Sequence, residues 1–204
     1  MGFYADHILP RAIAVACGSS KLGPWRSEAS EGLIGEVFEL GFGSGSNIAF
    51  YPPEVTSVVG LEPSGQARKI AERAIRSSPV RVDVSLGVGE EIPFESESFD
   101  SALMTFVLCS VADPEVVLAE IFRVLKSGSK LNFLEHGISD DQKVSARQHR
   151  LDPLQVRLGG GCHLVRNPPV LISRAGFEID SLRQDYGPGP RPWSYLSVGS
   201  ATKP

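Results

Sequence analysis

The sequence predicts an α/β fold in which a mostly parallel sheet carries helices on both faces. Three observations support this prediction. From about residue 36, apolar β-branched segments alternate with segments of helical periodicity, without a long linker or an internal repeat. The first predicted strand runs into a turn rich in glycine. The last two strands are joined by a short loop, which makes them adjacent and antiparallel, so we expect a mixed sheet.

Composition favours an ordinary globular protein. The chain has 204 residues, 42% hydrophobic and 22% charged, which is enough for one domain with a sizeable core. The net charge is −4 and no dense basic run occurs, so we expect no binding to nucleic acid or to anionic lipid. No apolar run approaches the length of a membrane span, and the N-terminus has no pattern of an export signal, so no stable membrane insertion is expected.

Three cysteines occur, at positions 17, 109 and 162. Their spacing matches neither a zinc motif nor a disulfide framework, so we expect no metal and a reducing, cytoplasmic compartment. A buried cysteine is often a small hydrophobic residue. No acid–base pair adjoins either Cys109 or Cys162 in the sequence, so covalent catalysis is not expected.

The chain is predicted to divide into a helical lid segment at residues 1–30 and one domain at residues 31–204. In the first segment, apolar residues from Ile8 to Ala16 recur at helical spacing. The expected strands are 36–40, 56–62, 80–86, 100–109, 130–136, 177–186 and 193–201. The expected helices are 45–50, 64–77, 113–126, 142–158 and 168–175. The third of these begins at Asp113-Pro114, an N-cap residue followed by proline at the first helical position.

The glycine-rich turn is the main functional signal. A buried strand ends at Glu39-Leu40, and glycines follow at positions 41, 43 and 45. Glycine lets a backbone approach a ligand closely, because it has no Cβ. The next strand ends in Glu62, about one βαβ unit later, where an acidic residue commonly binds ribose hydroxyls. The alternatives are a tight turn that binds nothing and, for Glu39, a solvated strand end.

These motifs resemble those of the class I S-adenosylmethionine-dependent methyltransferases. Residues 39–45 look like the first motif of that family, and Glu62 stands where its ribose-binding acid ends the second strand. Residues 89–94, followed by 98–100, look like its adenine-side loop, and residues 124–130 resemble the turn before its fifth strand. The resemblance implies a Rossmann-like fold with a mixed seven-stranded sheet and S-adenosylmethionine as cofactor. It assigns cofactor binding to Glu39, Gly41, Gly43, Gly45, Glu62, Gly89, Glu90, Phe106 and Val107.

A narrower resemblance extends to the thiol S-methyltransferases related to the methyltransferase-like 7 proteins and to ubiquinone/menaquinone-type methyltransferases. It rests on the motifs at residues 50–53, 108–111, 133–136, 151–153 and 160–163. It implies a small methyl acceptor, for which a thiol is favoured, while a phenol, a quinol or an activated carbon stay open. The membrane-anchoring N-terminus of the vertebrate relatives does not transfer, because polar residues interrupt the N-terminal helix here.

The catalytic candidates are His136, at the end of the fifth strand, and His163, in a loop that could cover the site. Each could equally be a structural histidine. His136 is the candidate base for an acceptor that must lose a proton. Tyr4 and His7 lie on the segment that commonly covers the acceptor in this fold. A monomer or a homodimer is expected.

Two other functional classes stay open. A nicotinamide-dependent oxidoreductase is disfavoured, because Ser46 stands where the dinucleotide motif carries its third glycine and about 35 residues precede the first strand. A non-catalytic protein that binds S-adenosylmethionine, as a sensor or a partner subunit, would carry the same binding residues as an enzyme.

Overall fold

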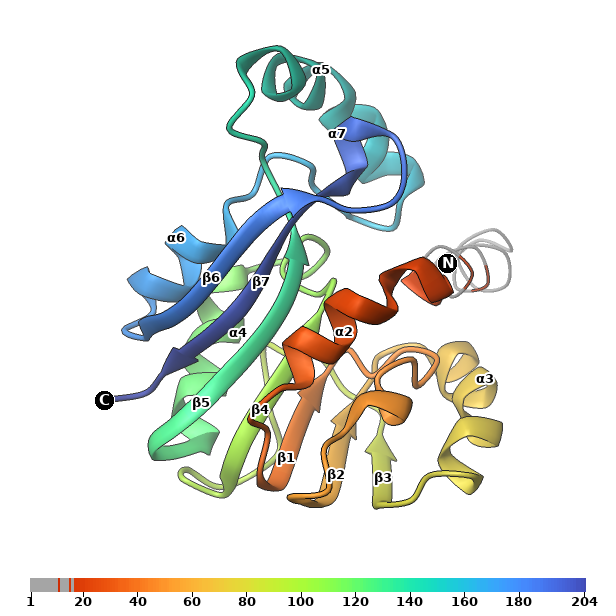
Figure 1. Cartoon of the computed structure of the whole chain (residues 1–204), viewed down its shortest axis with the longest axis vertical. Helices are drawn as coiled ribbons and strands as arrows, with labels where there is room; N and C mark the ends of the chain where they lie inside the picture. The colour runs from red at the N-terminus through yellow and green to blue at the C-terminus, as the bar shows by residue number, and fades with distance from the viewer. Residues whose placement is uncertain (1–10, 12–14, 16) are drawn as a thin grey trace.

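The computed structural model describes Arg11, Val15 and residues 17–204, so the predicted helix at Ile8–Ala16, with Tyr4 and His7, lies almost wholly outside the described residues. Within the described residues the sheet has seven strands, in the order β3-β2-β1-β4-β5-β7-β6 (Figure 1). The strands are β1 Gly35–Leu40, β2 Val55–Leu61, β3 Arg81–Ser85, β4 Phe99–Thr105, β5 Leu125–His136, β6 Glu178–Tyr186 and β7 Tyr195–Thr202. The helices are η2 Ser20–Leu22, α2 Gly23–Ser30, η3 Ile48–Phe50, α3 Gly65–Arg76, α4 Pro114–Val124, α5 Gln142–Leu158, α6 Pro168–Arg174 and α7 Arg191–Ser194.

The pairing of the strands confirms the mixed sheet. β1 pairs in parallel with β2 and β4, β2 with β3, and β4 with β5. β7 is antiparallel to both β5 and β6. β7 is therefore the one described strand of this sheet that runs against the others, and with β6 it forms the expected closing hairpin. Strand order changes direction between β1 and β4, and open α/β sheets bind ligands at such a switch point, beyond the carboxyl ends of the strands.

Two hydrophobic clusters fill the two sides of the sheet. Helices α4 and α6 cover one face, where Phe38, Leu118, Phe133 and Ile172 are fully buried. Helices α2 and α3 cover the other face, and there Ala29, Val37 and Ala71 are inaccessible to solvent. Successive residues of a strand point to opposite faces, so Val37 and Phe38 of β1 contribute to different clusters. Helix α5 packs on α7 beyond one end of the sheet (Figure 1).

The capped helices begin where their sequences indicate. The side chain of Asp113 accepts hydrogen bonds from the amides of Glu115 and Val116, and Pro114 occupies the first position of α4. Ser64 and Asp141 cap α3 and α5 in the same manner. Each cap satisfies amides that the helix itself cannot pair.

Several boundaries differ from the prediction. The helix expected at residues 45–50 is only the 3₁₀ turn Ile48–Phe50, because glycines occupy the preceding loop. β4 ends at Thr105 rather than residue 109, because Phe106 turns into the left-handed region with φ 59°. Within the segment predicted as helical, the start of α2 at Gly23-Pro24 was not expected, because glycine and proline are typical of a break.

In the part of the chain that the structure describes, no helix is both long enough and apolar enough to cross a membrane. Helix α2 lies within the segment predicted as a lid, and it packs against β5 and β7 with Trp25 buried. The division of the chain at residue 30 stays a prediction.

Candidate active site

A cavity of about 660 Å³ opens at the carboxyl ends of β1, β2 and β4. This volume lies within the range of small-molecule sites, roughly 300–1,000 Å³. Seven of the nine predicted cofactor-binding residues line the cavity. They are Gly41, Gly43, Glu62, Gly89, Glu90, Phe106 and Val107. Glu39 and Gly45, together with His136 and His163, do not line it.

The loop after β1 requires glycine for two different reasons. Gly41, Gly43 and Gly45 have φ of 68°, 57° and 76°, a region that side chains with a Cβ rarely adopt. At Gly41, a Cβ would also lie 2.5 Å from Cγ2 of Val107. At Gly45, it would lie 3.0 Å from Ile48 and 3.3 Å from Phe42, so this glycine allows the loop to pack on its own core. Gly41 and Gly43 thus form the cavity wall, while Gly45 shapes the turn behind it.

Glu62 follows β2 and is only 7% exposed, although its side chain lines the cavity. Its Oε2 accepts a hydrogen bond from the Gly43 amide at 2.8 Å, and its Oε1 accepts one from the Ser64 amide at 2.8 Å. Burial raises the pKa of Glu62, while these two amides act in the opposite direction. A carboxylate has about four acceptor positions, so two remain for hydroxyl donors in the cavity.

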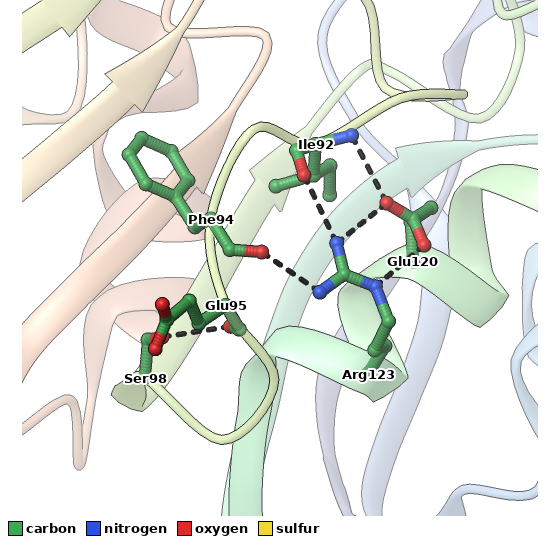
Figure 2. Close-up of polar contacts among 6 residues, drawn as sticks. All are labelled: Ile92, Phe94, Glu95, Ser98, Glu120 and Arg123. Atoms are coloured by element: carbon green, nitrogen blue, oxygen red, sulfur yellow. Dashed lines mark hydrogen bonds and ion pairs between the residues drawn. The ribbon is translucent and has the colours of Figure 1, made fainter.

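The loop that contains Gly89 and Glu90 is held from α4. Figure 2 shows the Arg123 guanidinium donating to the carbonyl oxygens of Ile92, at 2.9 Å, and Phe94, at 2.7 Å. The same guanidinium pairs with Glu120 through two 2.7 Å hydrogen bonds, and Glu120 in turn accepts from the Ile92 amide. These contacts fix the loop against the helix.

Each of the two loop residues in the cavity wall has its own constraint. Glu90 accepts a hydrogen bond from the Ala112 amide at 3.0 Å, which ties the loop to the segment before α4. A Cβ on Gly89 would lie 2.9 Å from Leu40, so the chain approaches β1 too closely for a larger residue. Gly89 and Glu90 are therefore held at a defined depth beside the cavity.

A buried polar network lies below the glycine loop. Asn47 donates to Oε1 of Glu39 at 2.9 Å and to Thr105 at 3.1 Å, while Tyr51 donates to Oε2 of Glu39. Arg26 of α2 donates to the Asn47 side-chain oxygen and, at 3.3 Å, to Thr105. Burial raises the pKa of Glu39 to about 7, although hydrogen bonds from Tyr51 and Asn47 lower it. Glu39 is therefore placed to orient Asn47, which lines the cavity.

The segment after β4 is bent by a second buried carboxylate. Glu135 of β5 accepts hydrogen bonds from the amides of Val107, at 2.8 Å, and Leu108, at 3.1 Å. These bonds compensate for the left-handed conformation of Phe106, which for a residue with a side chain costs about 1–3 kcal/mol. The bend places Phe106 and Val107 in the cavity wall. Burial raises the pKa of Glu135 to about 7.

The predicted catalytic histidines lie behind this wall. His136 is 7% exposed, its ring stacks on Phe106 with centroids 6.5 Å apart, and its Nε2 lies 3.1 Å from Sγ of Cys162. Nδ1 of His163 lies 3.0 Å from an Asp152 oxygen, and the backbone amide of His163 donates to the Cys109 carbonyl at 2.7 Å. The roles of both histidines stay predictions.

The comparisons with known proteins agree with this geometry. Residues 38–133 match the family model described as a methyltransferase domain. The chain belongs to the S-adenosylmethionine-dependent methyltransferases, and its cofactor is S-adenosylmethionine.

Within that class, the chain is similar to thiol S-methyltransferase TMT1B. It is 35% identical to the rat protein over 169 residues, covering 80% of this chain and 66% of the relative. Identity to the human protein is 33% over 175 residues, with coverage of 82% and 69%. The chain thus spans about two thirds of the length of these relatives. A ubiquinone/menaquinone biosynthesis C-methyltransferase from Geotalea daltonii is 30% identical over 106 residues, covering 50% of this chain and 45% of the relative.

Solved structures show the same fold. A SAM-dependent methyltransferase from Methanosarcina mazei aligns with a TM-score of 0.64 and 26% identity, over 82% of this chain and 92% of that one. A SAM-dependent methyltransferase from Thermotoga maritima aligns with a TM-score of 0.69 at 23% identity, over 97% of this chain and 99% of that one.

The cavity fits the cofactor. It is large enough for a nucleoside with an amino-acid side arm, and a buried carboxylate with spare acceptor positions lies in its wall. The loop beside that carboxylate has three glycines at which a side chain would be strained, and two of them, Gly41 and Gly43, line the cavity. Val88 also lines the cavity, so this position of the wall carries no acidic side chain.

Several site residues were not predicted. The cavity wall also contains Cys17, Arg26, Asn47, Thr105, Ser110 and Gly160. Asn47 directly follows the glycine loop. A polar side chain next to this loop could have indicated a binding residue. Arg26 stands in a helix whose start was not expected from the sequence, and no local pattern pointed to it. Glu135 is visible in the sequence only as part of a motif, and its contact with the 107–108 backbone depends on the pairing of β4 with β5.

Proposed function

We propose that this methyltransferase transfers the methyl group to the thiol of a small hydrophobic molecule. The supporting observation is the cavity at the carboxyl edge of the sheet, which combines the glycine loop and Glu62 with a largely apolar remainder that includes Leu40, Phe106 and Val111. A phenol, a quinol or an activated carbon is the alternative acceptor. The relatives named above fit these classes, because they are described as thiol S-methyltransferases and as a quinone-pathway C-methyltransferase.

Bound in the cavity, S-adenosylmethionine supplies a methyl group on a sulfonium that is already activated for in-line attack. The residues of the chain then have two tasks, orientation of the reactants and exclusion of water. Glu62 would accept hydrogen bonds from the ribose hydroxyls, and the Gly41–Gly43 backbone would contact the methionine arm. Gly89 and Glu90 would hold the adenine, and Phe106 and Val107 would complete the binding surface. Orientation of this kind supplies roughly 7–11 kcal/mol of a barrier.

Glu39 and Gly45 act indirectly in this scheme. Glu39 accepts the hydrogen bond that sets the Asn47 side chain, and Gly45 allows the loop to close on Phe42 and Ile48. Both residues are needed for the shape of the loop, although neither lines the cavity.

The residues that line the cavity favour a thiol. Among the described lining residues there is no histidine, and the titratable side chains are Cys17, Arg26, Glu62 and Glu90. A thiol with a pKa of about 8.5 is partly ionised at neutral pH and needs little help from a base. A phenol or an activated carbon depends more on a positioned base. For those acceptors the candidate is His136, which is separated from the cavity by the ring of Phe106.

The test is methyl transfer from isotopically labelled S-adenosylmethionine to matched sets of alkyl and aryl thiols, phenols and quinols. We expect labelled S-methyl products, identified by mass spectrometry, with hydrophobic thiols turned over fastest. Exclusive transfer to phenols or quinols would contradict the thiol proposal and point to His136 as a base. Binding of the cofactor with no transfer to any acceptor would favour the sensor or partner-subunit function.

A further inference from the structure

Three side chains of metal-ligating type converge behind the cavity wall. Cys109 comes from the segment after β4, His136 from the end of β5, and Cys162 from the loop between α5 and α6. The two sulfur atoms and the imidazole nitrogen all lie within 4.8 Å of one another, with Nε2 of His136 and Sγ of Cys162 at 3.1 Å. The residues are 27 and 26 positions apart in the sequence, so their meeting depends on the fold alone.

The polar atoms of these three side chains have few hydrogen-bond partners among the described residues. His136 is 7% exposed, and its Nδ1 is buried with no hydrogen-bond partner in the described residues. Its other ring nitrogen faces only a thiol, which is a weak hydrogen-bonding group. Cys109 is 3% exposed, and its sulfur has similarly weak contacts, at 3.6 Å to the Phe106 carbonyl and 3.3 Å to the Ser110 hydroxyl. The support for an ion comes from Nε2 and the two thiols, because an ion among these three groups would replace their weak contacts with stronger bonds.

Two thiolates and one imidazole form a set that suits Zn²⁺. The Zn–S and Zn–N bonds of about 2.3 and 2.0 Å place tetrahedral ligand atoms about 3.5 Å apart. The 3.1 Å distance from Nε2 of His136 to Sγ of Cys162 and the 4.8 Å upper limit for the group lie on either side of this value. The charge also balances, because two thiolates neutralise the ion in a site from which water is largely excluded. Hard ions such as Mg²⁺ and Ca²⁺ prefer oxygen ligands, so they do not fit this set.

We propose that Cys109, His136 and Cys162 bind a Zn²⁺ ion. Three protein ligands leave the fourth tetrahedral position for a water molecule or another small ligand. The ion joins the bent segment after β4, the end of β5 and the loop at residues 159–163. All three adjoin the cavity, whose wall includes Phe106, Ser110 and Gly160. Binding releases the two thiol protons to solvent, and no change of oxidation state is involved.

The first test measures metal content. The chain is purified without a polyhistidine tag, is kept reduced with a phosphine and is never exposed to chelator. After incubation with Zn²⁺ and removal of free ion, elemental analysis should give about one zinc per chain. Replacement by Co²⁺ should produce a thiolate-to-cobalt charge-transfer band in the near ultraviolet and visible bands of a tetrahedral site. These spectra report the ligands directly and do not depend on methyl transfer.

Variants identify the ligands. In Cys109→Ser and Cys162→Ser, the zinc content should fall at least tenfold, and the charge-transfer band of any residual cobalt should fall to about half. Cys17→Ser is the matched control, because Cys17 lies in the same region of the site but outside the group of three, and it should keep one zinc per chain. Chelator should lower the midpoint of thermal unfolding of the zinc-loaded wild-type chain. It should leave the midpoint of the Cys109→Ser/Cys162→Ser double variant unchanged.

Clear outcomes overturn the proposal. One is a reduced wild-type chain that takes up no more zinc or cobalt than the Cys109→Ser/Cys162→Ser double variant does. Another is a cobalt spectrum without the thiolate band. The wild-type measurements decide the question even where a variant fails to fold. A negative result for the metal does not affect the proposal that the methyl acceptor is a thiol, because that proposal is tested by methyl transfer alone.

Discussion

The backbone amide of Gly43 donates a hydrogen bond to Oε2 of Glu62 at 2.8 Å, which joins the segments that follow β1 and β2 at the cavity wall. The carboxylate therefore has two tasks: it holds the glycine loop and it presents acceptor positions to the cavity. Because both depend on the same group, a change in Glu62 should also disturb the loop, and a change in the loop should also weaken the ribose site.

Gly41→Ala should weaken cofactor binding at least tenfold. The backbone there has φ 68°, and the new Cβ would lie 2.5 Å from Val107, so the loop or the segment after β4 must shift. Gly128→Ala is the matched control, because Gly128 has φ 78° and a Cβ added there would have no atom within 4 Å. Both variants place an alanine in a left-handed backbone conformation. The difference between their affinities for S-adenosylmethionine, measured by titration calorimetry, therefore reports the clash between the new Cβ and Val107. Equal affinities for the two variants would contradict the assigned position of the loop.

Glu62→Gln should lower the affinity for S-adenosylmethionine by about tenfold. Hydrogen bonds to a charged acceptor exceed neutral ones by about 1–2 kcal/mol, and tenfold corresponds to about 1.4 kcal/mol. Glu72→Gln, on the exposed surface of α3, is the control and should bind as the wild-type chain does. Calorimetry with adenosine and with methionine separates the effects further, since the adenosine affinity should fall more than the methionine affinity, which responds only through the loop. An unchanged adenosine affinity would exclude Glu62 as the ribose ligand.

Stability should fall between pH 4.5 and about pH 7 because of Glu39. Burial raises the pKa of this carboxyl from 4.5 to about 7 in the folded chain, so in this window the folded state holds a proton that the unfolded state has lost. The free energy of unfolding therefore decreases as pH rises, by about 3 kcal/mol in total, and levels off above pH 7.

Glu39→Gln should remove this contribution, since glutamine does not titrate. The groups that face Glu39 are Tyr51, Asn47 and Arg26, and all remain in the variant. Urea unfolding at several pH values should show a smaller decrease in the variant than in the wild-type chain. The shifted pKa of Glu135 contributes equally to both proteins and cancels in the difference. Parallel curves for the two proteins would show that Glu39 is ionised in the folded state throughout.

Arg123→Lys should destabilise the chain by about 1–3 kcal/mol and weaken cofactor binding. The guanidinium donates to the Ile92 and Phe94 carbonyls and to Glu120 at once, whereas a lysine ammonium cannot reproduce this planar arrangement (Figure 2). Arg76→Lys, in an exposed pair on α3, is the matched control and should cost almost nothing. Urea unfolding gives the stability, and calorimetry gives the affinity. A stable variant with normal affinity would show that the 89–94 loop does not depend on this anchor.

Much of the fold could be predicted because its signals are local. Apolar runs bounded by turn residues indicated each of the seven strands, and Asp113-Pro114 indicated the start of α4 within one residue. The errors also have local causes. Phe106 ends β4 early through a backbone conformation that its residue type does not reveal, and helix α2 begins with a glycine and a proline.

The sequence by itself determined the fold class, the glycine loop and Glu62, because strand periodicity and glycine spacing act over a few residues. Only the tertiary structure decided that Arg26 reaches Asn47 and that Glu135 holds the backbone at Val107. It also decided that Cys109, His136 and Cys162 meet. These contacts join different strands, loops and helices, so they depend on strand register and helix packing. They therefore cannot be predicted from the residue types and spacing within any single segment of the sequence.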